Sequence, residues 1–394
     1  MKELIKNSSK LIRIEGVVFS ILLVIIFSNQ FHFLWLLYDF MALGALVFYL
    51  LNNRLVLNIT LTVTALYLLF FTFLSGGHII SYFAIWDNIK HLFVLFMMLI
   101  LVDRHANKKR IQVFLRDLGV ILSIVFFLQS IVVILQAYFG FHFDDISGTF
   151  GYGASHSLGY FCLMFLTYLI LFGRSRAYFL IIFIISLLLN YISENKGFYL
   201  LLIALLFFKL AWSYSVKRLP FYIIAFSLLI YIIDSLIGGR LISPIVYAIS
   251  TLSNNLMTGD ISEISVSRGF LMIYAYMKGG WFGLGPGAYS DCYSLSGWLL
   301  DNLSDGRLQI NISSATSCII EYGLIGTSIW IGLYLIFLSY FFKNISIKFF
   351  VWIFFLLCFF YNKLLVDERI IFMVIFIFTF LKVAYNQRIN NITK

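Results

Sequence analysis

The chain has 394 residues, of which 62% are hydrophobic and only 12% are charged, and its formal net charge is +10. Average soluble domains carry about 25% charged residues, and a soluble fold needs a polar shell that this composition does not supply. Soluble globular proteins, disordered chains and disulfide scaffolds are therefore excluded, and a polytopic membrane protein remains. The positive charge would indicate a nucleic-acid partner only if the basic residues formed one clustered face.

Long apolar runs recur along the chain. A spanning helix needs about 20 mostly apolar residues, and these runs are too long, and too little alternating, for membrane β-strands. The sequence therefore predicts an all-α polytopic membrane protein with about twelve transmembrane helices, with residues 1–394 forming a single membrane domain. The predicted helices lie near residues 11–28, 33–51, 56–75, 82–102, 115–138, 155–173, 176–193, 197–213, 220–237, 315–341, 343–361 and 364–384.

Most connections between these segments are short. The exceptions are a large loop at 238–314, between the ninth and tenth predicted helices, and a smaller polar loop at 139–154. With the N-terminus in the cytoplasm, all but eight of the 28 lysines and arginines lie at inner loops or inner helix ends, as the positive-inside rule requires. We therefore expect both termini inside and the 238–314 loop outside. The basic excess then faces anionic lipid, and no nucleic-acid partner is expected.

Charges of both signs lie on the outer side. The eight outward cations are Lys90, Lys196, Arg240, Arg268, Lys278, Arg307, Lys363 and Arg369. Asp145, Glu194 and Asp291 are outward acids, and Glu321 lies one to two turns inside the outer end of a predicted helix. An intramembrane carboxylate is unfavourable unless it faces a polar cavity or a partner. These charges indicate either a substrate site or a solvated surface of mixed sign.

Residues 261–289 are the most informative part of the large loop. Residues 261–278 are apolar on one side and predict a helix lying on the membrane surface. The following GGWFGLGPGAY stretch, 279–289, exposes backbone N–H groups that can approach an anion, with Arg268 or Lys278 adding charge. The alternative is a tight interfacial turn with an aromatic anchor.

Two further groups of polar residues each have a functional and a structural interpretation. Asp87, Lys90 and His91 share one helix face by their spacing, which indicates a buried ion pair that pins the bundle or, alternatively, a proton relay. The 139–154 loop places acids before a glycine-aromatic turn, a pattern that suits a sugar site or an ordinary connector. No histidines have metal-ligand spacing, so no metal site is expected.

Three stretches together resemble the O-antigen polymerase and ligase superfamily: Arg268, the WFGLGPG run at 281–287 and the EYGLIG run at 321–326. Its polymerases, called Wzy, are inner-membrane glycosyltransferases with a long periplasmic loop late in the chain. The resemblance covers the overall topology and, locally, residues 193–330. The polymerases' spacing of arginine, ten residues and glycine in the fifth outer loop is similar to Arg268 and Gly279.

Three details qualify the resemblance. The third outer loop, 139–154, lacks the arginine pattern of the polymerases, and Lys196 stands where arginine is usual. A lysine keeps the charge and loses the bidentate fork. The ligases carry a histidine in or after the long loop, whereas this chain has none after His156, which favours a polymerase.

The resemblance implies metal-independent and cofactor-free transfer in a GT-C-like fold, at the periplasmic face of a bacterial inner membrane. The partners would be undecaprenyl-diphosphate-linked glycans, membrane lipid and a chain-length regulator. The leaving diphosphate needs cations, for which the candidates are Arg268, Lys196, Arg240 and Lys278. The acceptor hydroxyl needs a general base, for which the candidates are Glu194, Glu321, Asp291 and Asp145. Trp281 and Tyr289 would stack on sugar rings.

Two alternatives remain at this point. One is an O-antigen ligase, and the other is a lipid-linked oligosaccharide flippase or another transporter, in which Asp87, Lys90 and His91 would form a coupling relay. The long outer loop argues against a transporter, because rocking helix bundles usually have short connections.

Overall fold

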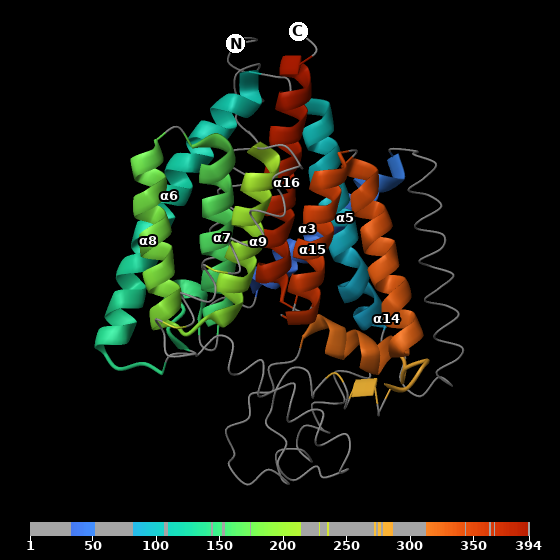
Figure 1. Cartoon of the computed structure of the whole chain (residues 1–394). Helices are drawn as coiled ribbons and strands as arrows, with labels where there is room; N and C mark the ends of the chain where they lie inside the picture. Colours follow the sequence, from blue (N-terminus) through green and yellow to red (C-terminus); the bar gives the residue numbers. More distant parts are fainter. Residues whose placement is uncertain are drawn as a thin grey trace, which may run out of the picture. The chain divides into compact units, whose positions relative to one another are not determined.

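The computed structural model describes most of the predicted helices and part of the large loop. The described residues are 33–51, 82–105, 109–142, 145–151, 154–173, 175–213, 228, 235, 272, 275–276, 279–286, 313–342, 344–361, 364–365 and 367–392. Within these ranges the regular elements are helices, and no strand occurs (Figure 1). The helices are α3 (Phe33–Leu51), α5 (Tyr82–His105), α6 (Lys109–Tyr138), α7 (Ser155–Phe172), α8 (Arg176–Ile192), α9 (Lys196–Ser213), α14 (Ser314–Phe341), α15 (Ile345–Tyr361) and α16 (Glu368–Ile392), with a short 3₁₀ helix η2 (Gly148–Phe150).

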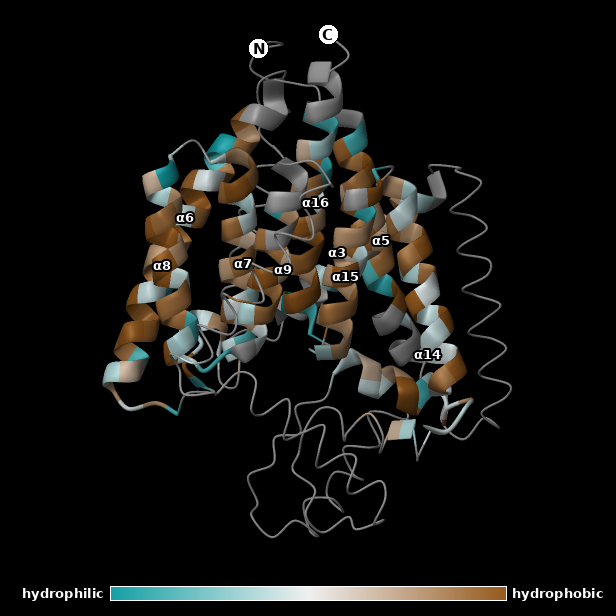
Figure 2. Ribbon diagram, in the orientation of Figure 1, coloured by the Kyte–Doolittle hydropathy of each residue, from teal (hydrophilic) through white to brown (hydrophobic). Residues whose placement is uncertain are grey.

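Every described α-helix falls on a predicted apolar run. The predicted runs at 11–28 and 56–75, and nearly all of 220–237, lie outside the described residues. Among the described residues, four helical stretches are long and apolar enough to cross a membrane: Val113–Tyr138, Ser155–Phe172, Ser314–Phe341 and Glu368–Gln387. The protein is therefore a helical membrane protein, and Figure 2 shows its helices dominated by hydrophobic residues.

The chain divides into two compact units. Unit 1 comprises Met1–Asn52, Lys90–Leu202 and Asp367–Lys394, and unit 2 comprises Asn53–Ile89 and Ile203–Val366. Each unit is thus assembled from segments that are distant in the sequence, and α5 and α9 each contribute residues to both units.

The buried helix α7 forms much of the core of unit 1. It packs against α16, α8, α6 and η2, and nearly all of its side chains from Ser155 to Leu169 are buried. A small residue permits close approach between helices. At Gly159 an added Cβ would lie 2.1 Å from Nδ2 of Asn195. The polar end of α7 therefore packs closely against the turn between α8 and α9.

Side-chain contacts fix the relative directions of the helices in unit 1. Arg369 in the first turn of α16 contacts Phe150 just before α7, and Phe380 midway along α16 packs on Tyr168 near the end of α7, so these helices are parallel. Lys90 contacts Glu368, and Asp103 contacts Lys382, so α5 is parallel to α16 as well. The loop that follows α6 meets the first turn of α16, so α6 runs the opposite way. At one end of unit 1, α16 begins and α6 ends. We call this end of the unit the "loop end".

Helices α14 and α15 of unit 2 form an antiparallel pair. Tyr334 stacks on Phe355 with ring centroids 4.9 Å apart, and the Trp352 indole N–H donates to the Leu335 carbonyl and to the Ser339 hydroxyl. Helix α14 is interrupted at Gly323, where φ is 68° and ψ is −175°. That interruption shapes the second polar region described below.

Candidate functional site

A charged cluster is buried at the loop end of unit 1. Nζ of Lys90 lies 3.0 Å from Oδ1 of Asp39 in α3 and 2.5 Å from Oε1 of Glu368 in α16. The lysine side chain is only 4% exposed, whereas those of Asp39 and Glu368 are 33% and 20% exposed. The cation is therefore enclosed, while both carboxylates are partly exposed.

A second polar pair lies beside this cluster. Nδ1 of His91 is 2.6 Å from the hydroxyl of Tyr38, and both residues are buried. Nζ of Lys90 also lies 5.6 Å from the centre of the Tyr38 ring, within the range of a cation–π contact. Consecutive residues of α5 thus contact consecutive residues of α3, and the two helices are joined through polar groups.

A buried ion pair at Lys90, as predicted, occurs in the structure, and two of its carboxylate partners come from other helices. These two partners are Asp39 and Glu368, 51 and 278 residues away in sequence. The side chain of Asp87 lies outside the described part of the chain. The pair therefore links three helices of unit 1 at one level.

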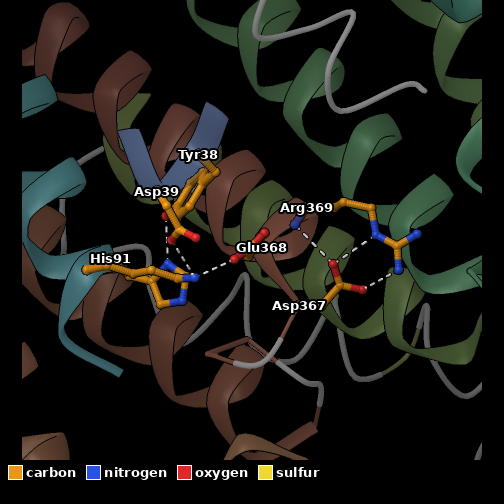
Figure 3. Close-up of polar contacts among 7 residues, drawn as sticks. Tyr38, Asp39, His91, Asp367, Glu368 and Arg369 are labelled. Atoms are coloured by element: carbon orange, nitrogen blue, oxygen red, sulfur yellow. Dashed lines mark hydrogen bonds and ion pairs between the residues drawn. The ribbon is translucent and has the colours of Figure 1, made fainter. Parts of the chain in front are cut away.

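Arg369 continues the polar region toward the loop after α6. Its guanidinium donates to both oxygens of Asp367, at 2.9 and 2.7 Å, and its Nη1 donates to the Phe150 carbonyl at 2.8 Å. Glu368 and Arg369 are adjacent in sequence, so the first turn of α16 contacts Lys90 through one residue and the loop through the next. Figure 3 shows the two side chains pointing to opposite sides, Glu368 toward Asp39 and Arg369 toward Asp367. Of the eight outward cations, the side chains of Lys90 and Arg369 are described, and both are paired with carboxylates.

Two glutamine side chains of α6 hold the loop after it. Oε1 of Gln136 accepts hydrogen bonds from the backbone N–H groups of Ser147 and Gly148, and its Nε2 donates to the Gly148 carbonyl. Gln129 makes a matching pair with the backbone N–H and hydroxyl of Thr149. Gly148 has φ of 69°, and a Cβ there would lie 2.0 Å from Oε1 of Gln129. This segment is thus a fixed part of the loop end.

We predict that Gln136→Leu loosens this loop. Two backbone donors and one acceptor lose their partner, and leaving such groups unsatisfied costs about 1–3 kcal/mol. Limited proteolysis of the purified protein, together with its thermal unfolding, measures the effect. Gln136→Glu is the matched control, because it keeps the oxygen that accepts both N–H bonds, and its loop should be cut more slowly than that of Gln136→Leu. A Gln136→Leu loop as resistant as the wild type would contradict this role.

The structure describes two of the predicted catalytic candidates in unit 1. Asp145 is buried in the held loop, where its backbone N–H donates to the His142 carbonyl. Glu194 is exposed in the turn between α8 and α9, and its φ is 47°. The side chain of Lys196, the first residue of α9, lies outside the described part of the chain. Asp145 therefore belongs to the same end of unit 1 as the charged cluster.

Asn195, which lies between Glu194 and Lys196, was not singled out from the sequence. Its Nδ2 donates to the Ser155 carbonyl at 3.1 Å and to Oδ1 of Asn190 at 3.1 Å. Its own Oδ1 lies 3.2 Å from Nδ1 of His156 and accepts from the backbone N–H of Phe198. Its position directly before the apolar α9 run is the signal that identifies it as a helix cap.

The two glycine-containing motifs meet in unit 2. In an uninterrupted helix the N–H groups of Leu324 and Ile325 would donate to the carbonyls of Ile320 and Glu321. Here Leu324 and Ile325 donate instead to the carbonyls of Gly280 and Trp281, at 3.0 and 3.1 Å. The freed carbonyls accept from a second pair of donors. These are the N–H groups of Leu284 and Gly285, at 2.8 and 2.9 Å.

The turn at 279–286, which we call the glycine turn, is therefore inserted into an opened step of α14. Gly283 has φ of 79°, and a Cβ there would lie 2.3 Å from the Glu321 carbonyl oxygen. Glu321 itself is buried, and Trp281 is exposed. Four N–H groups of this region thus bind carbonyls of the chain itself, so the glycines serve a backbone-to-backbone junction.

The other predicted site residues lie outside the described part of the chain. They are Arg240, Arg268, Lys278, Tyr289 and Asp291. Among the residues that the structure describes, no group of three or more His, Cys, Asp or Glu side chains gathers where it could hold a metal ion.

No protein-family model matches the chain, and no curated protein matches it.

Proposed function

We propose that the protein is a membrane glycosyltransferase that polymerises undecaprenyl-diphosphate-linked O-antigen repeat units at the periplasmic face of a bacterial inner membrane. The observation that carries the proposal is the charged cluster at the loop end of unit 1. In an apolar bundle, buried ionisable groups are costly, and they mark functional sites by default. The resemblance of the two glycine motifs, now joined in one junction, supports the same assignment.

The reaction needs a cation and a base. A hydroxyl oxygen of the acceptor unit attacks the anomeric carbon of the growing glycan, and the bond from that carbon to the carrier diphosphate breaks. The diphosphate leaves with the bonding electron pair, and a carboxylate takes the hydroxyl proton. Lys90 and Arg369 join Arg268 as candidate cations that would offset the charge of a leaving diphosphate without a metal. The partly exposed Asp39 and Glu368 join Asp145 as candidate bases.

The finer architecture is part of the proposal. It comprises twelve spans in a GT-C-like arrangement, both termini in the cytoplasm and a periplasmic 238–314 loop carrying Arg268. The helix directions in unit 1 support it, because α5, α7 and α16 are parallel and α6 is antiparallel to them. Those helices are the fourth, sixth, twelfth and fifth predicted spans, so alternate crossing gives this pattern. Membrane lipid and a chain-length regulator are the proposed further partners.

The test of this function is the lipopolysaccharide profile of a deletion strain. Loss of the gene should leave single capped repeat units and no long-chain ladder, and the wild-type gene should restore the ladder. Arg268→Ala should fail to restore it while the protein still inserts, and Arg268→Lys should be milder only if charge alone matters. An unchanged ladder in the deletion strain would contradict the polymerase function. A normal ladder with Arg268→Ala would remove only the role of Arg268.

A lipid-linked oligosaccharide transporter is the second candidate. The observation that favours it is the contact of Lys90 with carboxylates from two other helices, because such groups can serve proton relays in transporters. The location of the lipid-linked repeat unit in the deletion strain separates the two. Repeat units retained on the cytoplasmic side indicate a transporter, whereas capped units in the periplasm indicate a polymerase. In the ligase alternative, polymer would form but would not be attached to lipid A-core.

A further inference from the structure

The glycine turn of unit 2 presents a compact apolar surface. Trp281 and Phe282 are 55% and 47% exposed, and Leu284 beside them is also exposed. Tyr276 lies edge-on to Trp281 with ring centroids 5.9 Å apart. The turn from Gly279 to Pro286 contains no charged residue. A surface of this kind is unfavourable in water and is typical of a contact site.

The backbone of the turn holds these side chains in place. Four hydrogen bonds join the turn to the opened step of α14, two in each direction. At Gly279 an added Cβ would lie 2.2 Å from the Ile319 carbonyl oxygen, so the turn and the helix are in direct backbone contact. Trp281 and Phe282 are therefore presented from a fixed turn at the interruption of a helix.

The exposed apolar surface continues along α14. Ile325, Ile329, Ile336 and Tyr340 are all exposed, and with 3.6 residues per turn they fall on one face of the helix beyond the break. We call these four residues the α14 stripe. Helix α14 is long and apolar enough to cross a membrane, so an exposed apolar stripe along it is the face expected to meet lipid. The glycine turn lies at the start of that stripe.

We infer that the glycine turn inserts Trp281 and Phe282 into the interfacial region of the lipid bilayer and so fixes the depth of α14. Tryptophan is enriched at this level of membranes, because its ring is apolar and its N–H is polar. A bilayer is the occupant because the exposed turn is joined to Ile325, the first residue of the α14 stripe, through the hydrogen bond from the Ile325 N–H to the Trp281 carbonyl. The inference gives Trp281 a lipid contact in place of the sugar stacking expected from the sequence, and it does not require any catalytic activity.

Tryptophan emission from the full-length protein in phosphatidylcholine vesicles tests the inference. The emission of Trp281 is obtained as the difference between the wild type and Trp281→Phe. Lipids brominated near the headgroup end of the acyl chain should quench this difference more strongly than lipids brominated near the bilayer centre. Aqueous iodide should quench it weakly. The Trp281→Phe/Phe282→Trp exchange keeps the composition and should restore a bromolipid-sensitive emission.

Trp330→Phe is the matched control, because Trp330 is fully buried in α14. The emission of Trp330, obtained as the difference between the wild type and Trp330→Phe, should respond less to either lipid. If iodide quenches the emission of Trp281 and neither brominated lipid does, the inference is overturned in favour of an aqueous position. Bromolipid quenching that appears only when the protein is diluted in lipid would also overturn it, because the surface would then be covered by a second copy.

Discussion

Replacing Lys90 by methionine should destabilise the protein by about 3 kcal/mol and abolish long-chain polymer. The side chain is 4% exposed and contacts carboxylates of two other helices. Methionine removes the positive charge, so the carboxylates of Asp39 and Glu368 repel each other without a cation between them. Removing one partner of a buried ion pair is costly, because the remaining charge is no longer compensated. Thermal or denaturant unfolding in detergent measures the stability, and the lipopolysaccharide ladder of the complemented deletion strain measures function.

A triple variant separates the charge effect from the packing effect. Lys90→Met combined with Asp39→Asn and Glu368→Gln removes all three charges of the described ion pairs, so most of the lost stability should return. Function should stay lost, because the cation and two of the candidate bases are gone. A triple variant as unstable as Lys90→Met alone would show that the lysine acts through packing. A triple variant with a normal ladder would remove the cluster from the proposed mechanism.

The positions of the helices could be predicted because hydrophobic run length is a local property. Helix α3 spans Phe33–Leu51, as the sequence predicts, and α7 ends within one residue of its predicted end. Where a helix is shorter at one end than predicted, the difference is largest at α16, which begins at Glu368 rather than near residue 364. Just before this helix, the Leu365 N–H donates to the Ser314 hydroxyl and so takes part in a contact outside α16.

The candidate site could be predicted only in part. The burial of Lys90 follows from its position inside an apolar run, but Asp39 and Glu368 come from runs that nothing in the sequence pairs with it. Likewise, the two glycine motifs could be identified one at a time. Their exchange of hydrogen bonds depends on the chain folding back across about 40 residues from Gly283 to Gly323, a pairing that local spacing does not encode.

Replacing Gly323 by alanine should be the most damaging single-methyl change in the described part of α14. Its φ of 68° with ψ of −175° is a conformation that essentially only glycine adopts. A Cβ there would also lie 2.4 Å from the carbonyl carbon and oxygen of Trp281. Backbone strain and overpacking against main-chain atoms together should cost about 3 kcal/mol or more. Thermal unfolding in detergent measures the loss, and Gly332→Ala is its control.

Gly332 lies in the same helix, and nothing lies within 4 Å of a Cβ placed there. Alanine is the better helix former, so Gly332→Ala should be neutral or stabilising by up to about 1 kcal/mol. Gly283→Ala approaches the same junction from the turn, where its Cβ would meet the Glu321 carbonyl oxygen. Because Gly283→Ala and Gly323→Ala break one set of backbone hydrogen bonds, the double variant should lose clearly less than the sum of the two single losses. Additive losses would mean that turn and helix are stabilised separately, and the opened step of α14 would then have to be held by other contacts.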